Sequence, residues 1–199
     1  MATGEPGVGA DSMSDANMLV VVVDASGSMR EHGKAMIARQ LVAHLDAEHR
    51  SPEGPWQLGS LVVLRWGTET AVVDLSPGED LPVMVCGGRA QGSALVAALS
   101  ALVDGATTLR ALLISDGHLD PADVRAFTTW QRRNSRVSVR TIAVGPDAAT
   151  AALAKMAERG GAFLPEEIDQ ALTTWTLPRE STLPVSVAEL FPSASGARP

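Results

Sequence analysis

The stretch that decides the fold runs from Asn17 to Met29 and reads Asn-Met-Leu-Val-Val-Val-Val-Asp-Ala-Ser-Gly-Ser-Met. Its first part, residues 18–23, is an unbroken apolar run rich in β-branched valine, which predicts a strand buried on both faces. Strands of this kind belong to parallel sheets that helices cover on both sides. The run ends in Asp24, Ser26 and Ser28, and a polar loop at the carboxyl end of a parallel strand predicts a ligand site.

Length and composition are those of one globular domain: 199 residues, of which 45% are hydrophobic and 20% charged. A net charge of −7 argues against a nucleic-acid partner, because no basic surface is available to displace phosphate counterions. The single cysteine, Cys86, excludes an intrachain disulfide. The sequence shows neither a signal-peptide pattern nor an apolar run long enough to cross a bilayer. We therefore expect a cytoplasmic protein without a nucleic-acid or membrane partner.

Strand and helix patterns alternate along the chain after this first strand. Apolar residues at helical spacing predict helices over 30–49, 92–104, 121–132, 147–159 and 166–175. Further apolar runs predict strands over 58–66, 70–75, 109–115, 137–144 and 162–164. The short link between 58–66 and 70–75 predicts an antiparallel hairpin at a sheet edge. The order predicts an α/β fold, a doubly wound and mostly parallel sheet with one antiparallel edge strand and helices on both faces.

The two terminal segments lack this pattern. Residues 1–16 are rich in Gly, Ala, Ser and Asp, which predicts a disordered leader. Residues 177–199 are dominated by Pro, Ser and Ala and are interpreted as a tail, in which 185–191 is apolar enough to dock. The folded domain is expected to span 17–176.

Oxygen-bearing side chains gather in three predicted loops. Asp24, Ser26 and Ser28 follow the first strand, Ser93 stands at the start of a helix, and Asp116 follows the strand over 109–115. Because the carboxyl ends of parallel strands meet at one edge of a sheet, we expect these residues to lie close together. Carboxylate and hydroxyl oxygens are the ligands that Mg²⁺ prefers. The sequence therefore predicts a Mg²⁺ site, with Mn²⁺ and Ca²⁺ as alternatives.

The order of these motifs resembles the von Willebrand factor A (VWA) domain family. Asp24-Ala25-Ser26-Gly27-Ser28 matches its Asp-x-Ser-x-Ser metal-ion-dependent adhesion site, or MIDAS. Ser93 stands where the family usually has a threonine, and Asp116 stands in Ser-Asp-Gly where Thr-Asp-Gly is common. Residues 141–145 and 156–163 also match, so the resemblance covers about residues 17–175.

This resemblance implies a Rossmann-like fold and a module for protein–protein interaction. It implies that Ser26, Ser28 and Ser93 bind the metal directly, that Asp24 and Asp116 bind it directly or through water, and that a partner's Asp or Glu completes the coordination. Two carboxylates roughly neutralise the dication, which stays electrophilic toward that external carboxylate. In length and class, the chain also resembles the short intracellular bacterial VWA proteins. These commonly work beside AAA+ ATPases of the MoxR type or in stress and defence gene clusters.

Each motif also has a structural interpretation. Ser28 fits a capping box with Glu31, Ser93 fits a helix N-cap, and Asp116–Gly117 fits an ordinary turn. Two other functions stay open: a metal-dependent hydrolase or phosphatase, and a metal-free VWA scaffold that binds through its hairpin edge or tail. A phosphatase of the haloacid-dehalogenase type would need an aspartate where Ser26 stands, and no Gly-x-Ser-x-Gly or Walker motif is present. We therefore expect that the protein is not an enzyme.

Overall fold

The computed structural model describes residues 17–51, 60–75, 84–104, 106, 108–158 and 161–176. The predicted leader over 1–16 and the predicted tail over 177–199, with its docking segment, lie outside the described residues. All helices and strands given below fall between Asn17 and Thr176.

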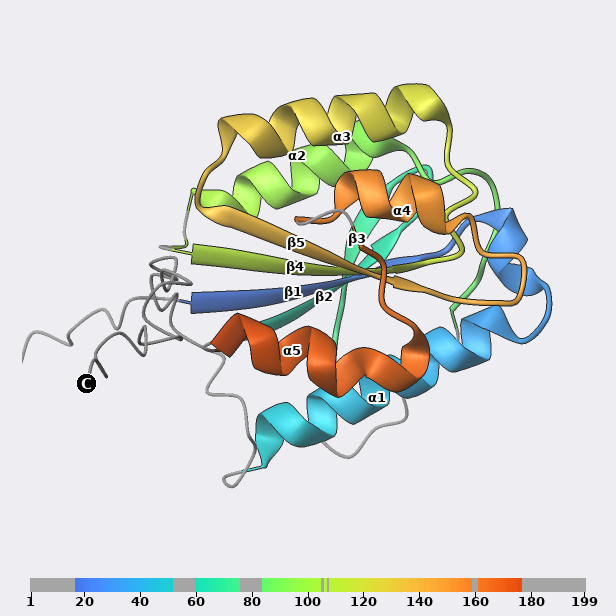
Figure 1. Ribbon diagram of the computed structural model, residues 1–199, viewed down its shortest axis with the longest axis horizontal. Coiled ribbons are helices and arrows are strands. Elements are labelled where there is room, and N and C mark those ends of the chain that lie inside the picture. The colour runs from blue at the N-terminus through green and yellow to red at the C-terminus, as the bar shows by residue number, and fades with distance from the viewer. Residues whose placement is uncertain are drawn as a thin grey trace, which may run out of the picture.

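Five strands form one sheet in the order β3-β2-β1-β4-β5 (Figure 1). Their bounds are β1 Asn17–Asp24, β2 Ser60–Trp66, β3 Thr70–Val73, β4 Thr108–Ser115 and β5 Val137–Ala143. Strand β1 lies at the centre and pairs in parallel with both β2 and β4, and β4 pairs in parallel with β5. Only β3 is antiparallel, in a hairpin with β2. The predicted doubly wound, mostly parallel sheet with one antiparallel edge is confirmed.

Helices cover both faces of this sheet (Figure 1). Helices α1 (Lys34–Arg50) and α5 (Ile168–Thr176) cover one face, and α2 (Gly92–Val103), α3 (Pro121–Arg133) and α4 (Thr150–Met156) cover the other. Two 3-10 helices, η1 (Gly27–Arg30) and η2 (Pro165–Glu167), complete the described elements. Alternate valines of β1 contact opposite helical layers. Val21 and Val23 pack with residues of α1 and α5. Val20 and Val22 pack with residues of α2 and α3. The central strand is thus buried on both faces, as its sequence predicts.

Three predicted elements differ most from the structure, and the other boundaries shift by one or two residues. The predicted helix over 30–49 begins only at Lys34, because η1 is followed by a turn with positive φ at His32 (52°) and Gly33 (71°). The predicted strand over 162–164 is a single parallel bridge between Phe163 and Ile142, since the 3-10 helix η2 begins at residue 165. The predicted helix over 147–159 is shorter and covers Thr150–Met156.

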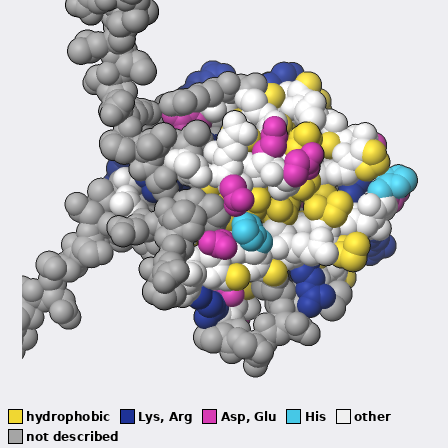
Figure 2. Space-filling model, turned by 60° about the horizontal axis from the view of Figure 1, so that its bottom comes forward, with side chains coloured by type: hydrophobic (Ala, Val, Ile, Leu, Met, Phe, Trp, Pro, Cys, Tyr) yellow, Lys and Arg dark blue, Asp and Glu magenta, His cyan; other side chains and the backbone are white. Residues whose placement is uncertain are grey.

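The face that α1 and α5 form carries acidic side chains near its centre and basic ones around its rim (Figure 2). This distribution agrees with the net charge of −7, and the described residues on this face form no continuous basic surface for a phosphate backbone. Within the described ranges, no helix has both the length and the apolar character that crossing a membrane requires.

Candidate metal centre

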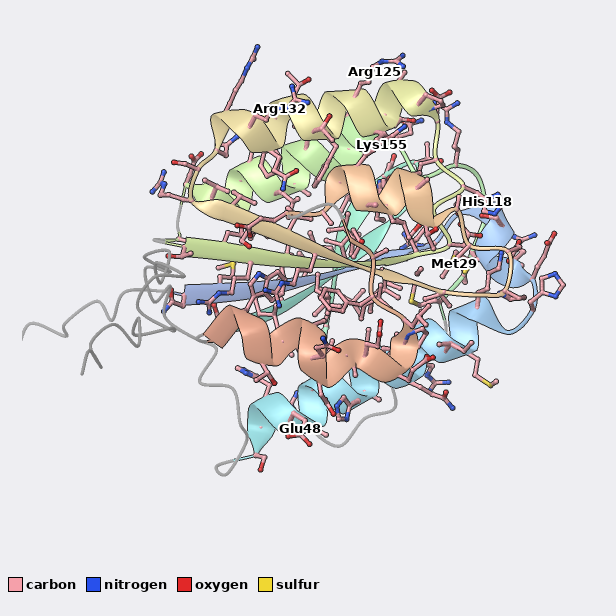
Figure 3. All side chains as sticks on the ribbon, in the orientation of Figure 1. Met29, Glu48, His118, Arg125, Arg132 and Lys155 are labelled. Atoms are coloured by element: carbon pink, nitrogen blue, oxygen red, sulfur yellow. The ribbon has the colours of Figure 1, made fainter. Side chains whose placement is uncertain are left out.

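The loops that follow β1, β2, β4 and β5 lie at the edge of the sheet where the carboxyl ends of these strands meet. The chain passes from β1 to β2 on one side and returns to β4 on the other, so the boundary between β1 and β4 is a topological switch point. The register places Val23 opposite Ile114, which makes Asp24 and Ser115 neighbours across this boundary. Figure 3 shows Met29 and His118 at this end of the molecule and Glu48 at the far end of α1.

Asp24 is fully buried at the end of β1. Its Oδ1 accepts a hydrogen bond from the backbone N–H of Ser26 (2.8 Å), and its Oδ2 accepts one from the Ser115 hydroxyl (2.6 Å). Burial raises the pKa of this carboxyl, although the hydrogen bonds from Ser115 and Ser26 oppose the effect. A cation beside Asp24 would stabilise its ionised form, so the side chain is placed where a bound metal ion relieves an electrostatic cost.

The hydroxyl oxygens of Ser26 and Ser28 lie 3.1 Å apart. In an octahedral Mg²⁺ site with bonds of about 2.0–2.1 Å, neighbouring ligand oxygens are about 3 Å apart. The two serines therefore fit one edge of such an octahedron. The capping-box interpretation of Ser28 is wrong, because α1 begins after Gly33 and Ser28 lies inside η1. In donor type and spacing, this loop fits a small dication.

Ser93 is the second residue of α2, and its side chain is exposed. Its N-cap interpretation is wrong, because the residue at the N-cap is Gln91. The segment before α2 packs beside the Asp24 loop, where the backbone N–H of Gly27 donates to the carbonyl of Gly88 (3.0 Å). The indole N–H of Trp66 donates to the carbonyl of Gln91 (2.8 Å), which ties the start of α2 to the end of β2. These contacts bring Ser93 to the same sheet edge, and its role as a ligand stays a prediction.

Asp116 is fully buried and faces a lysine to which the sequence analysis gives no role. The Lys34 ammonium lies 2.9 Å from Oδ2 of Asp116 and 2.8 Å from Oδ1 of Asp147, and the Lys34 side chain is 0% exposed. Burial alone lowers the pKa of Lys34, but its hydrogen bonds to Asp147 and Asp116 outweigh burial and raise the pKa. Lys34 thus carries a buried positive charge directly beside a predicted metal ligand.

Two further groups at this edge are absent from the sequence prediction. Ser115 lies in the quoted Ser-Asp-Gly motif, yet its hydroxyl is what holds Asp24, and its Oγ also accepts the N–H of Gly117 (2.9 Å). The exposed side chains of Glu31, His32 and Asp147 have potential ligand atoms within 4.8 Å of one another. Asp147 of this group is already paired with Lys34.

We expect the ion pair between Lys34 and Asp147 to make part of the stability acid-sensitive. The hydrogen bond from Lys34 lowers the pKa of Asp147 below its ordinary value of 3.8. Because the folded-state pKa is the lower one, this stabilisation is complete above the unfolded pKa and is lost as the pH falls through the folded pKa. Melting temperatures from about pH 6 to about pH 2 should therefore fall less for Asp147→Asn than for wild type. An equal fall would contradict this assignment.

Comparison of the sequence with protein-family models and with curated proteins returns no match. Solved structures share its fold at low identity. A von Willebrand factor type A protein from Catenulispora acidiphila is 19% identical, with a TM-score of 0.58 over 81% of this chain and 42% of that chain. The ArnB paralog VWA2 from Sulfolobus acidocaldarius is 16% identical (TM-score 0.58; 80% and 45%), and the pilus adhesin SpaC from Lactobacillus rhamnosus GG is 11% identical (0.58; 82% and 30%).

This chain thus spans less than half the length of each of these solved chains. The strand order, the antiparallel edge and the two helical layers agree with these likenesses. The chain has the Rossmann-like fold of von Willebrand factor A domains.

Proposed function

We propose that this protein is a metal-dependent protein-interaction module. Mg²⁺ binds at the carboxyl edge of the sheet, and an Asp or Glu of a partner protein completes its coordination. The residues that hold the ion are Asp24, Ser26, Ser28, Ser93 and Asp116. The observation that carries this proposal is the pair of serine hydroxyls 3.1 Å apart beside a buried carboxylate at the topological switch point. An adhesin among the structures of the same fold supports a protein partner.

The partner that we propose is an AAA+ ATPase of the MoxR type or another component encoded in the same gene cluster. This narrower proposal rests on the class of the domain alone, so its test must identify the partner directly. The cytoplasmic location predicted from the sequence stays a prediction.

We propose binding in preference to catalysis. Ser26 occupies the position that a phosphatase of the haloacid-dehalogenase type gives to its second aspartate, and its hydroxyl lies beside that of Ser28. A serine nucleophile needs a base within hydrogen-bond reach. The imidazole of His118 instead contacts the backbone carbonyl of Asp147 at 3.0 Å. Neither arrangement supports hydrolysis.

Removal of both hydroxyls in Ser26→Ala/Ser28→Ala is expected to weaken metal binding by at least about tenfold, because two neutral ligands are lost. Titration calorimetry of Mg²⁺ and Mn²⁺ into chelator-treated protein measures this directly. Ser135→Ala, at an exposed serine between α3 and β5, is the matched control and should bind as wild type does. If wild type binds neither ion, or if the double variant binds as well as wild type, the metal centre is wrongly assigned.

The partner is sought by affinity capture from native lysate, with Mg²⁺, with chelator, and with the Ser26→Ala/Ser28→Ala protein. A partner recovered only by wild type with Mg²⁺ supports the proposal. A partner recovered under all three conditions would place the interface elsewhere and favour the metal-free scaffold. Asp116→Ala is a poorer probe, because it removes one of the two carboxylates to which the buried Lys34 is hydrogen-bonded. The variant would lose stability for that reason alone.

A further inference from the structure

The side chain of Lys34 is fully enclosed at the edge of the candidate metal centre. It is the first residue of α1, and its ammonium reaches both Asp116 and Asp147. Its aliphatic stem passes Gly145, where an added Cβ would lie 2.6 Å from Cε and 3.0 Å from Cγ of Lys34. Gly145 has a φ of +98°, which a residue with a side chain rarely adopts. Both the space and the charges around this lysine are therefore matched to it.

The ammonium changes the charge balance that the two acidic ligands would otherwise give. Without Lys34, the carboxylates of Asp24 and Asp116 would roughly neutralise a bound dication. Lys34 offsets part of this negative charge, because its ammonium lies 2.9 Å from Asp116, although it is also paired with Asp147. Its own charge would also repel a dication bound to Asp116, in a buried setting where solvent and salt screen the interaction poorly.

We propose that Lys34 sets the metal affinity of this site: it keeps the free protein a weak binder and leaves the bound ion short of negative charge. An ion in that state recruits an external carboxylate more strongly than a fully neutralised one does. This inference rests on the proposed function and specifies how the same site is regulated. Metal and an acidic partner then bind cooperatively, each strengthening the other.

The test compares Lys34→Met with Lys155→Met. Methionine is unbranched and apolar, so it fits the slot beside Gly145 without carrying charge. Lys155 is the only other lysine of the chain, and it is exposed on α4 (Figure 3), so Lys155→Met changes the net charge equally at a solvated position. With Mn²⁺ alone as the probe, calorimetry should show at least about tenfold tighter binding for Lys34→Met and less than about a twofold change for Lys155→Met.

A stability measurement accompanies this titration. Lys34→Met leaves Asp116 buried without its cation, so the metal-free variant should melt below wild type. Mn²⁺ should then raise its melting temperature by more than it raises that of wild type. If Lys34→Met does not fold without metal, Asp147→Asn replaces it, because its side chain is 40% exposed. Removing this second partner leaves the Lys34 charge less compensated, so Mn²⁺ binding should weaken severalfold.

The outcomes separate the inference from the proposed function. Equal Mn²⁺ affinity in Lys34→Met and wild type, with binding still lost in Ser26→Ala/Ser28→Ala, overturns the inference and leaves the metal-dependent module standing. If Lys34→Met does not fold, an unchanged Mn²⁺ affinity of Asp147→Asn overturns the inference and leaves the metal-dependent module standing. Failure of wild type to bind Mn²⁺ overturns both.

Discussion

Replacement of Trp66 by alanine is expected to lower the free energy of unfolding by about 3–5 kcal/mol. Trp66 is 1% exposed and packs in the core between the sheet and α2, in the cluster that contains Leu95 and Leu99. Truncation would leave a cavity there and release the carbonyl of Gln91 from the indole N–H. Urea unfolding followed by circular dichroism measures the loss.

Trp66→Phe is the matched control, because it keeps an aromatic ring but removes the hydrogen bond to Gln91. Its loss should be smaller, about 1–2 kcal/mol. Equal losses for the two variants would show that the hydrogen bond, and not the packing, is the larger contribution. A loss below about 1 kcal/mol for Trp66→Ala would contradict the assignment of Trp66 to the core.

Gly117→Ala is the second substitution with a large expected effect, about 2–4 kcal/mol of stability. Gly117 has a φ of +75°, and an added Cβ would lie 2.7 Å from the carbonyl oxygen of Ala149. Neither atom can yield easily, because both belong to backbone that is hydrogen-bonded at this edge: Gly117 donates to Ser115, and Ala149 donates to the carbonyl of Asp116 (2.7 Å). Chemical unfolding of the variant measures the loss.

Gly161→Ala is the matched control for Gly117→Ala. A Cβ at Gly161 would meet no atom within 4 Å, so the change should stay within about 0.5 kcal/mol. Similar losses at both glycines would show that conformational strain at Gly117 is not the cause. Because Gly117 follows Asp116, its variant should also weaken Mn²⁺ binding, whereas Gly161→Ala should not.

The sheet was predictable from sequence because its central strands are buried on both faces. Burial of this kind requires long apolar runs such as those of β1 and β4, and such runs are visible without a structure. The limits of α1 and the predicted strand over 162–164 were not predictable to the same degree. The start of α1 depends on the turn with positive φ at His32 and Gly33, and the strand is reduced to one bridge between Phe163 and Ile142.

The candidate site likewise has residues that were predictable from the sequence and one, Lys34, that was not. Asp24, Ser26 and Ser28 lie within five consecutive residues, so their mutual placement follows from local sequence. Lys34 shows no such signal, because a lysine in the first turn of a helix is usually solvated. Its burial depends on Asp116 and Asp147, which are 82 and 113 residues away in the chain. Long-range charge pairing of this kind cannot be read from spacing.

The burial of Lys34 also decides how the protein reacts with amine-specific reagents. With Lys34 enclosed, Lys155 on α4 is the one exposed lysine among the residues that the structure describes. Acylating dyes should therefore modify Lys155 quickly and Lys34 only when the loops around Asp116 and Asp147 open. The rate at which Lys34 is modified therefore measures how fast this edge of the sheet opens. Mass spectrometry of the wild-type protein follows that rate.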